Sequence, residues 1–140
     1  MAEENSWVLK GKIVSGVKKG AFFTRLDWVQ EQCREKLGFR PYPGTLNLEL
    51  SSEYLPVVEA MQKLEGIELS SPDPVFCSGK TLPVKIEGVS GAIIIPAEEV
   101  RVHGKNIVEI IAPLKLRESL DVTDGDAVTV VVNSSQLQKT

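Results

Sequence analysis

The feature that most constrains the fold is PYPGTLNLEL at residues 41–50, a proline- and glycine-containing turn followed by alternating leucines. Leucine stands at every second position, the period of a strand with one buried face: Leu46, Leu48 and Leu50. The intervening residues then share the opposite face: Thr45, Asn47 and Glu49. The stretch predicts a half-buried strand whose polar face begins directly after a turn.

Other segments predict a chain made mostly of short strands. Strand-like runs occupy residues 7–16, 91–96, 106–113 and 127–132, the first ending in glycine and the last preceded by an Asp-Gly turn. Residues 74–88 are typical of two short strands around a glycine turn. Helical patterns cover residues 24–38 and 54–66, the second with Pro56 in its first turn. The sequence thus predicts an α+β, mainly β fold: a small closed barrel with one or two inserted helices.

The segment at residues 24–38 is the clearest helix. Thr24 and Asp27 resemble a capping box at its start, and Gly38 stands where a C-terminal cap belongs. An apolar stripe at helical spacing runs through Leu26, Val29, Cys33 and Leu37. We therefore interpret Cys33 as a core residue.

Length and composition indicate one soluble domain. The 140 residues suffice for a hydrophobic core, with 42% apolar and 25% charged residues, and no apolar run reaches a membrane-span length of about 20 residues. We expect one domain over residues 1–140, ordered from about 6 to 133. The acidic start MAEENSW is unlike a secretory or transit signal, and two cysteines in unrelated contexts favour a reducing compartment. We therefore expect a cytoplasmic protein, and we expect it to be a monomer.

Two motifs allow both a structural and a functional interpretation. Residues 11–20 have neither a Walker A nor a GxGxxG pattern, and a turn is the simpler interpretation, although lysines between glycines ahead of a helix also suit phosphate. Thr45 and Asn47 are two neutral oxygens on one strand face, a pattern that completes a Mg²⁺ shell or satisfies turn hydrogen bonds. From the residues alone, the turn interpretation is preferred.

The remaining polar residues indicate no standard catalytic group. Residues 115–118 are the start of a short helix or a charged loop beside a ligand, and Glu109 interrupts an apolar run. His103 lies in a polar loop, and no Ser-His-Asp set or zinc-spaced cluster is present. An enzyme of this composition would depend on positioning and charge neutralisation.

Taken in order, the motifs resemble one family. PGTLNL at residues 43–48, followed by GAIIIP at 91–96 and EIIAPLKLRE at 109–118, is similar to the archaeal-type CTP-dependent riboflavin kinases. The resemblance runs from about residue 11 to residue 132. It implies a six-stranded cradle-loop barrel of the swapped-hairpin kind that phosphorylates riboflavin to FMN, with CTP as donor.

The resemblance also implies roles for individual residues. Thr45 and Asn47 would bind Mg²⁺, and Glu109 and Val102 would lie in the flavin site. The nucleotide would lie between two segments: Gly16, Val17, Lys18, Lys19, Gly20 and Ala21 on one side, and Lys115, Leu116, Arg117 and Glu118 on the other. We name no general base beyond the candidate Glu49.

Two departures from the family pattern keep alternatives open. Lys18 replaces a middle glycine of the loop, and Arg101-Val102 stands where a threonine or serine is common. These departures motivate a second hypothesis, a non-catalytic nucleotide or flavin sensor. A third is a DNA-binding swapped-hairpin module, against which the net charge of −3 and the pI of about 5.3 argue. We expect no nucleic-acid and no membrane partner.

Overall fold

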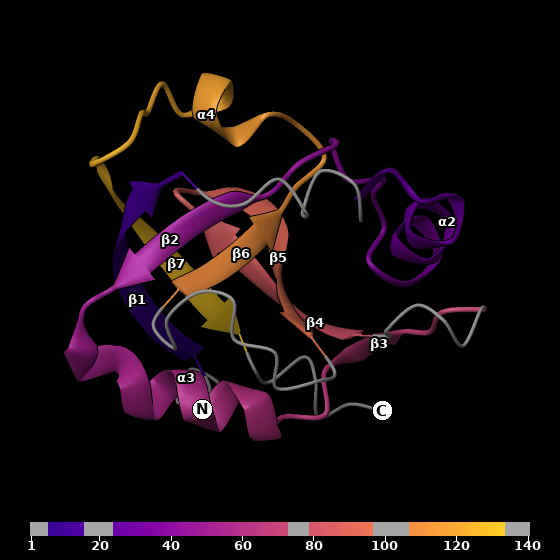
Figure 1. Ribbon diagram of the computed structural model, residues 1–140, viewed down its shortest axis with the longest axis horizontal. Coiled ribbons are helices and arrows are strands. Elements are labelled where there is room, and N and C mark those ends of the chain that lie inside the picture. The colour runs from indigo at the N-terminus through magenta and orange to yellow at the C-terminus, as the bar shows by residue number, and fades with distance from the viewer. Residues whose placement is uncertain (1–5, 16–23, 73–78, 97–106, 134–140) are drawn as a thin grey trace.

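The computed structural model describes residues 6–15, 24–72, 79–96 and 107–133, and Figure 1 shows its strands curled into a barrel. The strands are β1 (Ser6–Val14), β2 (Leu46–Leu50), β3 (Ile67–Leu69), β4 (Gly79–Ile86), β5 (Val89–Pro96), β6 (Ile107–Ile111) and β7 (Ala127–Asn133). The helices are α2 (Asp27–Lys36), η2 (Ser52–Tyr54), α3 (Leu55–Lys63) and α4 (Leu116–Ser119). Among the described residues, no helix combines the length and the apolar composition needed to cross a bilayer.

Six strands form the barrel, and every described pairing between them is antiparallel. Their order is β4-β5-β6-β2-β1-β7, and pairing of β4 with β7 closes the ring. The short strand β3 adds to the outside edge of β4. Closure pairs both edges of each barrel strand, which satisfies the backbone without a free sheet edge. The predicted mainly β fold, a small six-stranded barrel with inserted helices, is confirmed.

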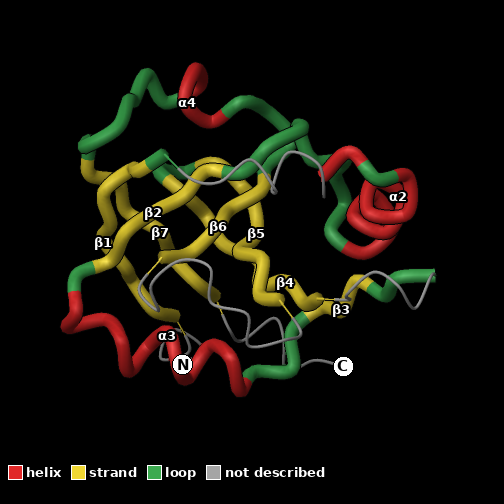
Figure 2. Tube along the Cα trace, viewed as in Figure 1, coloured by secondary structure: helices red, strands yellow, loops and turns green. Residues whose placement is uncertain are grey.

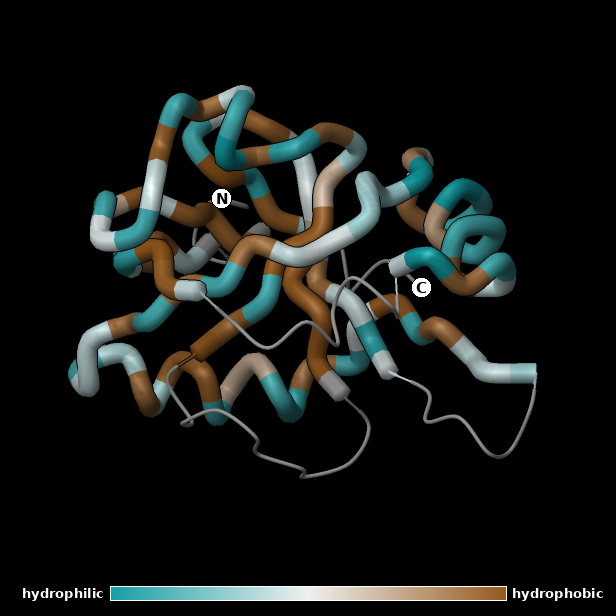
Figure 3. The backbone as a smooth tube through the Cα atoms, turned by 45° about the horizontal axis from the view of Figure 1, so that its top comes forward, coloured by the Kyte–Doolittle hydropathy of each residue, from teal (hydrophilic) through white to brown (hydrophobic). Residues whose placement is uncertain are grey.

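The barrel core is closed at its two ends by helices. Val58 and Met61 of α3 and Leu116 of α4 belong to the same buried cluster as the inward residues of the strands. Figure 2 shows α3 and α4 at opposite ends of the barrel. Figure 3 shows hydrophobic residues concentrated along the strands between them. The predicted helix with Pro56 in its first turn is confirmed as α3.

A second, smaller core fixes α2 against the outside of the barrel. Val29 and Cys33 pack there with Leu69, Ala92 and Ile111. Cys33 is a core residue as predicted, and burial raises the pKa of its thiol to about 11. This packing holds α2 beside the ends of β5 and β6.

The start of α2 differs from the prediction, whereas its end agrees. The helix begins at Asp27 with Leu26 as N-cap and no side-chain cap, so the expected Thr24 capping box is wrong. Thr24 Oγ1 instead accepts the Gly44 N–H at 2.7 Å. Gly38 ends the helix with a φ of +87°, and its N–H donates to Cys33 O at 3.0 Å.

The expectation of two strands around a glycine turn in residues 74–88 is also wrong for the described part. β4 is one strand from Gly79 to Ile86, because Gly79 and Lys80 pair on both sides, with β3 and with β5. The turn follows β4 at Glu87 and Gly88, both with positive φ. Residues 74–78 lie outside the described residues. The sequence analysis missed β3, since three residues are too few to show a period.

We expect Gly91→Ala to destabilise the barrel. A Cβ atom at Gly91 would lie 2.5 Å from the carbonyl oxygen of Ile111 on the neighbouring strand, so the backbone must shift. Overpacking of this kind costs about 1–3 kcal/mol of unfolding free energy, measured by urea denaturation. Ser90→Ala on the same strand adds no atom and is the control. Equal urea midpoints for the two variants would contradict the close approach.

Candidate functional site

The predicted metal ligands lie in a row that crosses neighbouring strands on the outside of the barrel. Asn47 of β2 pairs with Val14 of β1 on one side and with Glu109 of β6 on the other. Directly paired residues of antiparallel strands point to the same face. The leucines of β2 are buried in the barrel core: Leu46, Leu48 and Leu50. The predicted division of β2 into a leucine face and a polar face is confirmed.

Thr45 and Glu109 contact each other within this row. The hydroxyl of Thr45 donates to Glu109 Oε1 at 3.1 Å. Because β2 begins where β6 ends, two segments 64 positions apart in the chain meet at one end of the barrel. Figure 1 shows this end between α2 and the loop that carries α4.

Asn47 has a buried oxygen without a partner. The side chain is 7% exposed, and Oδ1 receives no hydrogen bond from any described residue. Leaving such an acceptor unpaired costs about 1–3 kcal/mol, so this amide oxygen is a candidate ligand for a bound cation.

The chemistry of this row suits a hard cation. The oxygens of Thr45 and Asn47 are neutral, and Glu109 supplies a carboxylate next to them. Mg²⁺ prefers such oxygen ligands and commonly takes few from protein when phosphates supply the rest. In the described part of the chain no group of three or more His, Cys, Asp or Glu could hold a metal. A cation here would therefore need anionic substrate groups to balance its charge.

The segment at residues 115–118 lies at the end of β1. Arg117 pairs with Asp124 at 2.7 Å, and Asp124 Oδ2 accepts the Ser15 hydroxyl at 2.5 Å. The Ser15 hydrogen bond and then Arg117 lower the pKa of Asp124. Lys115 and Glu118 form an exposed ion pair at 3.6 Å. Asp124 thus joins the charged segment to the residue that precedes Gly16.

Not all predicted residues can be placed. Leu116 has its side chain in the barrel core, so only its backbone could line a nucleotide. Glu49 is exposed and lies two positions beyond Asn47 on β2, opposite Lys12. The proposed loop and the second flavin residue lie outside the described residues: Gly16, Val17, Lys18, Lys19, Gly20, Ala21 and Val102.

A surface cavity of about 790 Å³ lies elsewhere on the barrel. Its lining comes from the C-terminal end of α2 and the β4–β5 hairpin, and includes Phe39, Lys85 and Ser90. None of the predicted site residues lines it. The described polar row, rather than this cavity, has the chemistry of an active site.

Sequence reasoning missed several contacts of the site. Asp124 appeared only as a turn residue, although it meets Ser15 across a separation of 109 positions. Thr24 and Gln30, which bond to the turn before Thr45, appeared as helix residues. No spacing in the sequence could indicate these contacts, because they depend on how the barrel closes and on how α2 packs against its outside.

A family model for CTP-dependent riboflavin kinases, described as a domain of unknown function, DUF120, matches residues 13–132. The chain belongs to this family. The match covers the polar row, the α4 segment and residues 127–132 of β7, and it confirms the resemblance seen in the motifs.

Similar proteins named riboflavin kinase come from several archaea. The protein of Pyrobaculum aerophilum is 40% identical over 131 residues, covering 89% of this chain and 60% of the relative. That of Methanocella arvoryzae is 41% identical over 125 residues, covering 89% of this chain and 56% of the relative. That of Methanobrevibacter smithii is 37% identical over 123 residues, covering 87% of this chain and 97% of the relative. The chain therefore spans little more than half the length of the first two and nearly all of the third.

We expect Asn47→Leu to be at least as stable as the wild type without ligands. The substitution replaces an unpaired buried oxygen with an apolar group of similar size, so the unfolding free energy should stay level or rise by about 1 kcal/mol. Urea denaturation without metal or nucleotide measures this. Leu48→Ala, which opens the core beside it, should lose about 2–5 kcal/mol and is the contrast. A large loss in Asn47→Leu would show that Asn47 has a structural partner.

We expect the contribution of Asp124 to the free energy of unfolding to depend on pH. Because its pKa is lowered below the ordinary 3.8, its contribution is complete above that value and disappears as the pH falls through the lower folded-state pKa. The urea midpoint of Asp124→Asn should lie below that of the wild type at neutral pH, and the two should converge below pH 3.8. Asp121→Asn, at a left-handed position that asparagine tolerates, is the control. A gap that persists in acid would contradict the pairing.

Proposed function

We propose that this protein is a riboflavin kinase that transfers the γ-phosphate of CTP to the 5′-hydroxyl of riboflavin, giving FMN and CDP. The observation that carries the proposal is the unpaired, buried oxygen of Asn47, set beside Thr45 and Glu109 in a chain of this family. A phosphoryl-transfer site needs positioned oxygens for a metal more than it needs a nucleophile of its own.

Thr45 and Asn47 would hold the metal of this reaction. When bound, Mg²⁺ would neutralise charge on the transferred phosphoryl group. The Thr45 hydroxyl donates its hydrogen to Glu109, which leaves its lone pairs directed away from that carboxylate and available to a cation. Asn47, the other protein ligand, is buried, so bulk water is excluded from its side chain.

The nucleotide would lie between residues 16–21 and residues 115–118. The Ser15–Asp124–Arg117 contacts support this, since they hold the start of the first segment close to the second. Arg117 would bring a positive charge to the phosphates, and Lys115 a second one from the exposed side of the same segment. Backbone groups at Leu116 and Glu118 would contact the base or ribose.

Glu109, with Val102, would border the flavin. In the reaction, the 5′-oxygen of riboflavin forms a bond to the γ-phosphorus, the bond from that phosphorus to the bridging oxygen of CTP breaks, and the hydroxyl proton must leave. Of the two candidate carboxylates, Glu109 lies beside Thr45 and Asn47, whereas Glu49 is two positions further along β2. We therefore propose Glu109 as the proton acceptor in place of Glu49.

We expect the pure protein to form FMN from riboflavin with CTP and Mg²⁺. Thr45→Ala and Asn47→Ala should each lower turnover at least about 100-fold, because each removes a metal ligand. Loss of a residue that only supports a ligand usually costs less than this. FMN separated by chromatography gives the rate, and parallel reactions with UTP and ATP test the donor. Wild-type turnover in either variant would refute the metal assignment. If no FMN forms while CDP still raises the melting temperature, the protein is a sensor.

We expect Glu109→Gln to lower kcat by about 10²–10⁴-fold, the usual contribution of a general base, while Glu49→Gln changes it little. The glutamine can still accept the Thr45 hydrogen bond, so Mg²⁺ dependence should change less than kcat. The pH profile of kcat in the two variants is the measurement. A larger loss in Glu49→Gln would return the role to Glu49.

We also propose that the protein acts as a cytoplasmic monomer. Its acidic composition and small size are compatible with this. Light scattering after gel filtration, with and without CDP, measures the mass.

A further inference from the structure

The turn that leads into β2, residues 41–44, is held by hydrogen bonds at three of its backbone groups. The Pro41 carbonyl accepts Gln30 Nε2 at 2.8 Å, and the Tyr42 N–H donates to Ala112 O at 2.8 Å. The Gly44 N–H donates to Thr24 Oγ1 at 2.7 Å. Because Pro41 and Pro43 have no N–H, both N–H groups of this turn are hydrogen-bonded.

Two side chains, Thr24 just before α2 and Gln30 in its first half, provide most of this support. Thr24 is fully buried at 0% exposure. Gln30 Nε2 donates to the Thr24 carbonyl at 2.6 Å as well as to Pro41, so one amide joins the helix start to the turn. Hydrogen bonds that are partly shielded from water restrict their partners more than fully exposed ones do.

The hydrogen-bonded turn determines the position of Thr45. Gly44 has a φ of +118°, a conformation that residues with a side chain rarely adopt, and Thr45 follows directly. Gly44, whose N–H bonds to Thr24, is the residue directly before Thr45, whose hydroxyl donates to Glu109. A rotation of this turn would therefore move Thr45 away from Asn47.

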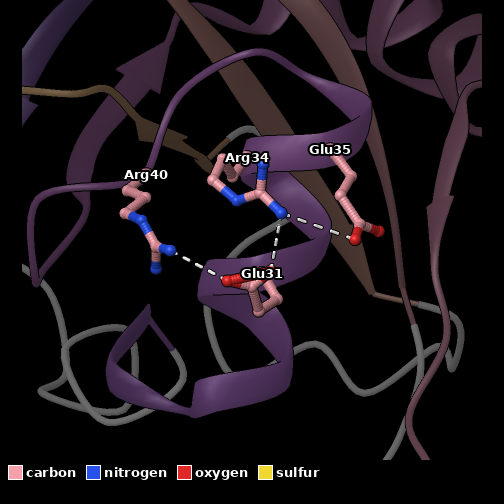
Figure 4. Close-up of polar contacts among 4 residues, drawn as sticks. All are labelled: Glu31, Arg34, Glu35 and Arg40. Carbon is pink, nitrogen blue, oxygen red and sulfur yellow. Dashed lines mark hydrogen bonds and ion pairs between the residues drawn. The ribbon is translucent and has the colours of Figure 1, made fainter.

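A surface ion pair also joins α2 to this region, but it is much weaker. Glu31 pairs with Arg40, the residue before the turn, at 2.8 Å and with Arg34 at 2.9 Å (Figure 4). Both partners of the Glu31–Arg40 pair are about half exposed, at 49% and 54%. Exposed pairs contribute little to positioning, so the partly buried Thr24 and Gln30 hydrogen bonds dominate.

We infer that Thr24 and Gln30 are positioning residues of the metal site: through the Pro41 carbonyl and the Gly44 N–H they hold the turn that directs Thr45 toward Asn47. This inference rests on the proposed function. It adds that α2 and the residue Thr24 just before it, which supply no ligand, determine how well the ligands converge on the cation.

The test compares Thr24→Val with Thr24→Ser. Valine keeps the shape but removes the acceptor of the Gly44 N–H, whereas serine keeps the acceptor. We expect valine to raise the Mg²⁺ concentration for half-maximal CDP binding about tenfold, the effect of one lost buried hydrogen bond, and serine to stay near the wild type. Calorimetric CDP titrations at a series of Mg²⁺ concentrations measure this without turnover. In the kinase assay, kcat at saturating Mg²⁺ should be nearly unchanged.

A second pair of variants tests the inference without changing Thr24, so that it stays testable if Thr24→Val does not fold. Gln30→Met loses both hydrogen bonds to Thr24 and Pro41 and should also raise the Mg²⁺ requirement. Gln32→Met, on the same helix, is the control: it loses the two hydrogen bonds to Ser70, the residue after β3, and the one that Gln32 Oε1 accepts from Lys36, and should leave the Mg²⁺ requirement unchanged. Glu31→Gln, which breaks the surface pair, should also leave it unchanged.

The outcomes separate the inference from the proposed function. If Asn47→Ala binds CDP with the same Mg²⁺ dependence as the wild type, the proposed metal site is wrong. If Asn47→Ala loses that dependence but Thr24→Val and Gln30→Met keep it, the metal site stands and the positioning role is overturned. Equal effects of Gln30→Met and Gln32→Met would also overturn it, since the loss would then come from helix stability alone.

Discussion

The hydrogen-bonded pairing of β2 between β1 and β6 is the constraint on which the rest of the structure depends. It places three leucines of β2 in the barrel core and, through the two-residue period of a strand, turns Asn47 outward between Val14 and Glu109. A shift of one residue in this pairing would bury Thr45 and Glu49 and expose the leucines. The large apolar area of the core therefore also stabilises the register that assembles the polar row.

The polar row is supported from outside the barrel by a different set of interactions. The small core under α2 holds that helix beside β5 and β6, and Thr24 and Gln30 then reach the turn before Thr45. The Ser15–Asp124–Arg117 contacts connect the other two strands of the region, since Ser15 follows β1 and Asp124 precedes β7. Within the polar row, the buried oxygen of Asn47 has no hydrogen-bond partner in the described part of the chain. A buried polar atom that lacks a hydrogen bond lowers stability, and such an atom is a common mark of a functional site.

Much of the architecture was predictable because its signals are local. The alternation in residues 45–50, the Pro56 helix start and the Gly38 helix end each depend on a few neighbouring residues, and all three agree with the structure. The Thr24 capping box failed because a tertiary partner, the Gly44 N–H, competes for the same hydroxyl. The glycine turn expected within residues 74–88 failed because pairing with β3 and β5 keeps Gly79 extended.

The sequence by itself determined the strand periods, the polar face of β2 and, through the order of its motifs, the family. It placed Thr45 and Asn47 on one face because a strand's alternation is a property of consecutive residues. Only the tertiary structure decided that Glu109 stands against them, that Asp124 meets Ser15, and that α2 supports the turn. These contacts join segments separated by 20 to 109 positions, and barrel closure together with the packing of α2 on its outside, rather than any local preference, brings such segments together.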